Sequence, residues 1–86
     1  MRFDLTDLRL FVHIVEAGSI TAGAGRNNLT LAAASGRIRG MEESLGTALL
    51  GRHSRGVVPT PAGETLLRHA RAVLDQMERL KGDLSA

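Results

Sequence analysis

Apolar residues recur at helical spacing in four stretches of the chain. The first stretch predicts a helix over Leu5–Ala17, with Asp4 at its N-cap and Gly18 at its end. Residues 1–3 are expected to form a short lead before it. The apolar stripe of this helix consists of Leu5, Leu8, Phe11, Val12 and Val15, with Ile14 beside it.

A second, shorter helix is predicted over Thr21–Asn28, with Ser19 as its cap. Gly23 and Gly25 each weaken a helix by about 1 kcal/mol relative to Ala, so tertiary contacts must hold this segment. Two close glycines also suggest a nucleotide-binding loop, but no strand is predicted before them. Asn28 moreover occupies the place of the third glycine of GxGxxG. We therefore attribute both glycines to close helix packing.

The third stretch predicts a helix that Thr30 caps and Gly46 ends. Its buried stripe, at intervals of 4, 3 and 4, is Ala34, Ile38, Met41 and Leu45. Its other face is small and basic, with Thr30, Leu31, Ala32, Ser35, Gly36 and Arg39, and Arg37 stands beside it. Short side chains allow another molecule to approach the helix backbone closely. DNA is the natural candidate, because such a helix fits the major groove.

The second and third helices, joined by a short turn, form a helix-turn-helix pattern. Two short apolar runs, 48–50 and 57–58, then flank the polar segment Gly51–Gly56, which predicts a β-hairpin, or wing. Its tip is expected to carry Arg52, His53, Ser54 and Arg55. A wing beside a recognition helix typically reaches a phosphate strand or the adjacent minor groove. His53 has no second ligand at a workable spacing, so no metal site is predicted.

A long fourth helix is predicted from Thr60, as N-cap, and Pro61 to about Leu84. At 1.5 Å per residue it would be about 35 Å long. Its apolar residues form a heptad seam, namely Leu66, Ala70, Val73, Met77, Leu80 and Leu84. A domain this small cannot cover the whole seam, so we predict that it pairs with a second copy, particularly beyond Ala70. The alternative is that the seam packs on its own domain alone.

Composition narrows the class of protein. The chain has 86 residues, enough for one small core, and no Cys, which excludes disulfides and thiolate metal sites. Neither a membrane-spanning run nor a signal segment is recognised, so a cytoplasmic protein without a membrane partner is expected. Net charge is only +2, but seven arginines and three acidic residues lie between Arg26 and Arg71. Arginine suits bidentate recognition of phosphate and guanine.

Taken together, these features resemble the N-terminal DNA-binding domain of the LysR-type transcriptional regulators. The resemblance runs from about Leu5 to Leu80 and rests on the order and spacing of six segments. These are LRLFV (8–12), EAGSIT (16–21), AASGRI (33–38), EESLG (42–46), LLGR (49–52) and TPAG (60–63).

The resemblance implies a mostly α-helical fold, a winged helix-turn-helix over residues 1–59 followed by a dimerisation helix over 60–86. Members of the family pair these helices in an antiparallel dimer, which can join a second dimer in a tetramer. They usually run to about three times this length and bind a small-molecule effector through a C-terminal domain. We therefore expect a fragment of a longer regulator, or a natural short form, with no cofactor of its own.

The resemblance also implies where DNA would be contacted. The candidate residues are Ser19, Thr21, Thr30, Leu31, Ala32, Ser35, Gly36, Arg37, Arg39, Arg52, His53, Ser54 and Arg55. Three positions depart from the family pattern. Leu31 replaces a familiar Gln, Gly36 stands where a basic residue is common, and Asn27 fills a usually apolar position. At the wing, Arg52 has an alternative structural role in an ion pair, which leaves Arg55 as the better minor-groove candidate.

The predicted function is therefore a sequence-preferring regulator that binds double-stranded DNA as a homodimer. An alternative is a winged-helix module that binds protein, but the helix 30–46 face lacks the aromatic and large aliphatic side chains typical of protein-binding hot spots. An enzyme is not expected. The three His are far apart in sequence, no HExxH or paired-carboxylate site is found, and Glu42 and Glu43 are interpreted as a solvated helix face.

Overall fold

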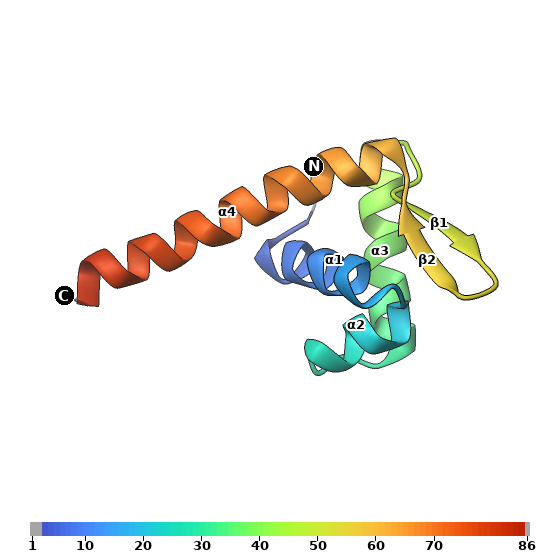
Figure 1. The fold of residues 1–86 in the computed structure, drawn as a ribbon, viewed down its shortest axis with the longest axis horizontal. Coiled ribbons are helices and arrows are strands. Elements are labelled where there is room, and N and C mark those ends of the chain that lie inside the picture. Colours follow the sequence, from blue (N-terminus) through green and yellow to red (C-terminus); the bar gives the residue numbers. More distant parts are fainter. Residues whose placement is uncertain (1–2, 86) are drawn as a thin grey trace.

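The computed structural model describes residues 3–85, so the expected lead at residues 1–3 lies outside the description except for Phe3. The elements are α1 (Leu5–Ala17), α2 (Ile20–Arg26), α3 (Leu31–Leu45), β1 (Leu50–His53), β2 (Gly56–Pro59) and α4 (Pro61–Ser85). Figure 1 shows α4 reaching away from the other elements on one side and the β1–β2 wing projecting on the other. The molecule measures 46 × 25 × 20 Å along its principal axes. This is the predicted winged helix-turn-helix followed by a long helix.

Local capping signals set the ends of α1 and α3 where the sequence predicts them. At the start of α1, the Asp7 N–H donates to the Asp4 carboxylate and the Asp4 N–H donates to the Asp7 carboxylate, both at 3.0 Å. Thr30 caps α3 by accepting a hydrogen bond of 3.0 Å from the Ala33 N–H. Gly18 and Gly46 end the two helices in the left-handed conformation, at φ 71° and 69°.

Helix α2 is shorter than the predicted Thr21–Asn28. It ends at Arg26 because Asn28 takes up a left-handed conformation, with φ 55°, that cannot continue a right-handed helix. Gly23 is explained by close packing, since a Cβ there would collide with the side chain and backbone of Ile14. That explanation was wrong for Gly25, which has open space where its Cβ would lie.

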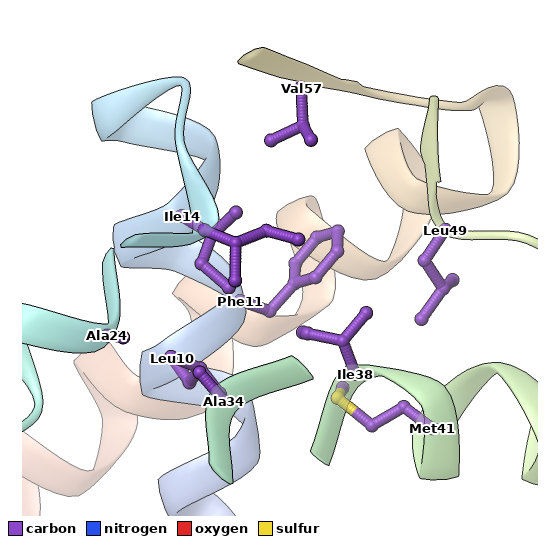
Figure 2. Packing of buried hydrophobic residues seen from close by; sticks show 10 residues of the cluster. Leu10, Phe11, Ile14, Ala24, Ala34, Ile38, Met41, Leu49 and Val57 are labelled. Carbon is purple, nitrogen blue, oxygen red and sulfur yellow. The ribbon is translucent and has the colours of Figure 1, made fainter. Parts of the chain in front are cut away.

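The core joins α1, α3 and the wing (Figure 2). Phe11 lies at its centre, and the predicted α3 residues Ala34, Ile38 and Met41 are buried beneath it. Helix α1 is buried over a wider arc than the predicted stripe because it contacts α2, α3, β2 and α4. Leu10, which the stripe omitted, is therefore fully buried.

The wing is an antiparallel pair in which Leu50 lies opposite Pro59 and His53 opposite Gly56. Its strands reach further than predicted, so Arg52 and His53 belong to β1 and only residues 54–55 form the turn. The Val57 N–H donates to the Gly18 carbonyl oxygen at 3.0 Å and docks the wing on the end of α1.

Glu42 anchors the other side of the wing. Its carboxylate accepts hydrogen bonds from the N–H groups of Leu49 at 2.7 Å and Leu50 at 3.4 Å. Glu42 is therefore partly buried and ties the end of α3 to β1, so its interpretation as part of a solvated face was wrong. Glu43 is exposed, as predicted.

Helix α4 begins where predicted, with the Gly63 N–H donating to the Thr60 hydroxyl at 3.0 Å. Its first half packs on the domain, and Ala70 is only 1% exposed. Its second half runs clear of the domain and leaves Val73, Leu80 and Leu84 exposed. Within residues 3–85, no helix is both long and apolar enough to cross a membrane.

Candidate nucleic-acid interface

An open groove of about 400 Å³ lies between the start of α2, the first turns of α3 and the wing. It is lined by Ser19, Ile20, Thr21, Leu31, Ser35, Arg52, His53, Ser54, Gly56 and Val57. Seven of these residues were candidates from the sequence: Ser19, Thr21, Leu31, Ser35, Arg52, His53 and Ser54. The fold thus brings three separate segments of the chain to one surface, which we call the groove face.

Five further candidates lie outside the groove and are exposed to solvent. Thr30 caps α3, Ala32, Gly36 and Arg39 are on that helix, and Arg55 is in the wing turn. Arg39 lies one helical turn beyond Ser35 on α3, so it extends the groove face along that helix. Arg55 extends the same face along the wing.

The charged side chains on this surface are basic, and none is acidic. No Asp or Glu occurs between residues 17 and 41 or between 44 and 63, and these two segments supply all the groove residues. Arg39, Arg52 and Arg55 form no ion pair with any residue of the described range 3–85. Their guanidinium charges are therefore uncompensated locally and give the groove face a positive potential. The alternative prediction for Arg52 was a structural ion pair, and no acidic residue within 3–85 forms one with it.

Arg37 faces the other way. Its Nη1 lies 2.9 Å from an Asp7 carboxylate oxygen and 3.6 Å from one of Asp4. The hydrogen bond to Asp7 raises the pKa of Arg37, and Asp7 itself is 7% exposed. Arg37 thus joins α3 to α1 and compensates a buried charge, which the sequence analysis did not anticipate, and its contact with DNA stays a prediction. A sequence signal existed, because Asp7 shares the i, i+3, i+4, i+7 face of Leu10, Phe11 and Ile14.

Two residues, Glu16 and Asn27, form further polar contacts within the domain. Glu16 pairs with Arg26 at 3.6 Å and with Arg71 at 3.4 Å, which links α1 to both α2 and α4. The Asn27 side-chain amide donates to His13 Nδ1 at 2.7 Å and to the Gly23 carbonyl oxygen at 3.0 Å. The hydrogen bond to Gly23 explains why position 27 is polar, since it gives a donor to a carbonyl oxygen of α2.

His53 shapes the wing turn. Its Nδ1 accepts a hydrogen bond of 3.2 Å from the Arg55 N–H. His53 also lines the groove, so its ring adds a polar group to that surface. Among residues 3–85, no cluster of three or more His, Asp or Glu side chains could hold a metal ion.

A second, apolar hollow of about 570 Å³ lies under the first half of α4. It is lined by Phe3, Leu8, Leu45, Thr47, Leu49, Ala62, Thr65, Leu66, His69, Ala70 and Val73. Three residues of the predicted seam, Leu66, Ala70 and Val73, belong to this hollow, and Met77, Leu80 and Leu84 continue the seam along the projecting helix. Ala70 is already buried within its own chain, so it has little surface left for the predicted contact with a second copy.

Comparison with known proteins identifies the same architecture. The family model described as "Bacterial regulatory helix-turn-helix protein, lysR family" matches residues 5–64. The chain is 39% identical over 79 residues to the HTH-type transcriptional activator TtdR of Escherichia coli K12, which covers 92% of this chain and 26% of TtdR. It is 43% identical over 72 residues to the nitrogen assimilation regulatory protein nac of the same organism, covering 84% and 24% of the two chains. The chain thus spans about a quarter of the length of these relatives.

Similar solved structures include complexes with DNA. The BenM_DBD/catB site 1 DNA complex superposes with a TM-score of 0.90 at 32% identity, covering 96% of this chain and 92% of that one. The CbnR_DBD–DNA complex gives a TM-score of 0.85 at 32% identity, covering 96% and 94%.

Proposed function

Because this chain belongs to the lysR family of bacterial regulatory helix-turn-helix proteins, we propose that it is a transcriptional regulator that binds duplex DNA with some sequence preference. One observation carries the proposal. A groove face free of carboxylates joins α2, α3 and the wing, and it presents three arginines that no acidic residue of the described chain neutralises. The DNA complexes of BenM_DBD and CbnR_DBD, which have similar folds, support it.

In the proposed complex, α3 enters the major groove. Ala32 and Gly36 have side chains of one carbon or none, so the helix backbone can approach the base edges closely. One sugar-phosphate strand passes through the groove between α3 and the wing. The hydroxyls of Ser19, Thr21 and Ser35 are positioned to donate to its phosphates.

The arginines hold the complex in register. Arg39 lies further along α3 and binds a phosphate or a base edge of the same major groove. Arg55, at the wing turn, reaches the neighbouring backbone or minor groove, where the negative potential favours arginine. Arg52 and His53, which line the groove from β1, would add further polar contacts.

We further propose that a second copy covers the exposed seam of α4. Leu80 and Leu84 are large apolar side chains on a helix that projects beyond its own domain. The apolar hollow under the first half of α4 is continuous with this seam through Val73. In functional terms, residues 1–59 would bind DNA and residues 60–86 would pair. Two recognition helices held by such a pair would contact half-sites about 34–36 Å apart, or a multiple of that spacing.

This chain spans about a quarter of the length of its relatives TtdR and nac. Effector control by a small molecule, and assembly of two dimers into a tetramer, would require a region outside these 86 residues. Within them, the proposal is limited to DNA binding and pairing.

The test is a titration of the chain with a duplex enriched from a random-sequence pool, followed by fluorescence anisotropy. Arg39→Ala and Arg55→Ala should each weaken binding about tenfold, and the double variant more, because each removes a charge-assisted contact of about 1–3 kcal/mol. Arg79→Ala is the matched control, since Arg79 is an exposed arginine on the distal half of α4, paired with Asp75 at 3.0 Å. Full affinity of the double variant, or no duplex enriched at all, would reject the proposal.

A further inference from the structure

The exposed surface of α3 is poor in hydrogen-bonding groups. Its first three turns present the small residues Ala32, Ala33, Gly36 and Gly40 to solvent. Ser35 is half-buried, and Arg39 is the nearest long polar side chain. A helix of this kind has few means of reading a base edge through hydrogen bonds.

Leu31 differs from these small residues because its side chain is large and aliphatic. It is the first residue of α3 and is 51% exposed, which makes it the one large apolar side chain of α3 that the described structure leaves exposed. It takes no part in the hydrophobic core or in the layer of partly buried residues packed on it. Its side chain lines the groove instead, on the same face of α3 as Ser35, one turn further along. The fold therefore gives Leu31 no packing role that accounts for it.

The major groove of DNA presents one apolar group, the C5-methyl of thymine. Adenine, guanine and cytosine present only donors and acceptors there. We propose, on the basis of the proposed function, that Leu31 recognises thymine by contact between its side chain and that methyl group. The same chemistry accepts 5-methylcytosine, which carries a methyl group at the same ring position, and rejects unmodified cytosine and deoxyuridine.

The expected discrimination follows from the size of one methyl group. Burying one carbon group of this kind contributes about 0.8 kcal/mol, which corresponds to about a fourfold difference in affinity. Replacing dT by dU at the contacted position removes this methyl group and leaves the Watson–Crick pairing and every major-groove donor and acceptor in place. A fourfold weakening at one position, and none at most others, is therefore the signature of methyl recognition.

The experiment begins with two parallel selections of the 86-residue chain from random duplex pools, one made with dT and one with dU. The best duplex from the dT pool is then resynthesised with dU at each thymine in turn, and the dissociation constants are measured. We expect one thymine per half-site whose replacement weakens binding about fourfold. At that position, a 5-methyl-dC·dG pair should bind more tightly than a dC·dG pair.

Three variants assign the effect to Leu31. Leu31→Gln and Leu31→Ala should bind the dT and dU duplexes equally, whereas Leu31→Met, which keeps a long apolar side chain, should keep the preference. Arg39→Ala is the matched control, because it should weaken binding to both duplexes without changing their ratio.

The two proposals fail in different ways. If neither pool yields a bound duplex, the proposed function fails and the inference with it. If duplexes bind but dU is tolerated at every position, DNA binding stands and only the methyl recognition is refuted. A methyl preference that persists in Leu31→Ala would also refute it, because the contact would then belong to another residue.

Discussion

At the scale of single residues, Asp7 and Arg37 form an ion pair that joins α1 to α3 beside the hydrophobic core. Asp7 is the one charged residue of the described chain that is buried, and the guanidinium of Arg37 lies 2.9 Å from it. A carboxylate in that position requires a compensating cation, since an unpaired buried charge is costly. Arg39, two residues further along, is exposed and has no acidic partner in residues 3–85.

Arg37→Ala should therefore reduce the stability of the fold, whereas Arg39→Ala should leave stability unchanged and weaken DNA binding. Arg37→Ala should lower the free energy of unfolding by about 1–3 kcal/mol, because it leaves the buried Asp7 carboxylate without a cation beside it. Arg39→Ala should change that free energy by no more than about 0.5 kcal/mol. Urea denaturation followed by circular dichroism measures both. Equal stability of the two variants would contradict the structural role of Arg37.

Asp4 gives the chain a defined response to acid. The hydrogen bond from the Asp7 backbone N–H lowers the pKa of the Asp4 carboxyl below its ordinary value, and the charge of Arg37 acts in the same direction. A pKa lowered in the folded state stabilises the fold above the unfolded-state pKa of about 3.9, and this stabilisation is lost as pH falls through the folded-state pKa.

Asp4→Asn should therefore reduce the loss of stability below about pH 4, because Asn keeps a capping oxygen but does not titrate in this range. The measurement is the urea midpoint of both proteins between pH 7 and pH 2. An identical pH dependence for the variant and the original chain would show that Asp4 contributes nothing to it.

At the scale of elements, signals close in sequence predicted the bounds of α1 and α3. Contacts between elements determined the length of β1 and the burial of Leu10. Asp4, Gly18, Thr30 and Gly46 act on their own neighbours in sequence, so the bounds of α1 and α3 could be predicted from residue types alone. The length of β1 and the burial of Leu10 depend on which elements meet, and periodicity within one segment does not contain that information. Glu42 illustrates the same limit, since its partners Leu49 and Leu50 belong to the next element.

The candidate site was predictable to a similar degree. The small, basic face of α3 and the polar wing were visible in the sequence, and the fold joins them in one groove. The orientation of Arg37 was harder to predict, because Arg37 and Arg39 flank the same buried residue, Ile38. Only the position of Asp7 on α1 shows which of the two turns inward.

Glu42→Ala should loosen the wing relative to α3. Removal of the carboxylate leaves the Leu49 N–H without its acceptor and should lower the free energy of unfolding by about 1–3 kcal/mol. Glu43→Ala, at the exposed neighbouring position, is the control and should stay within about 0.5 kcal/mol of the original chain. If Glu43→Ala proved the more damaging of the two, the anchoring role of Glu42 would be wrong.

At the scale of the whole molecule, the projecting half of α4 is the feature that its own domain does not explain. Leu84 is 79% exposed at the far end of a helix that extends well beyond the core. Together with Val73 and Leu80 it forms an apolar stripe on an otherwise charged helix. A stripe of this kind is typical of an interface between helices.

Leu80→Gln should weaken the proposed dimer. In a twofold-symmetric pair, each substitution removes an apolar contact from both copies, so the dissociation constant should rise at least tenfold. Glu78→Gln is the matched control, since it introduces the same residue on the opposite face of α4 and should change the constant by less than about twofold. Sedimentation equilibrium gives both values. A chain that is monomeric throughout, or a dimer indifferent to Leu80→Gln, would contradict pairing through the seam.

Binding of the proposed kind brings the groove face against the phosphate backbone of duplex DNA, and the salt dependence of the association constant measures that contact. The logarithm of the association constant should fall linearly with the logarithm of salt concentration, with a slope of about −0.9 for each phosphate bound. In the Arg39→Ala, Arg55→Ala double variant, the slope should become shallower by about 0.9 for each phosphate that the variant no longer binds. A slope near zero in the original chain, or the same slope in both proteins, would contradict the account.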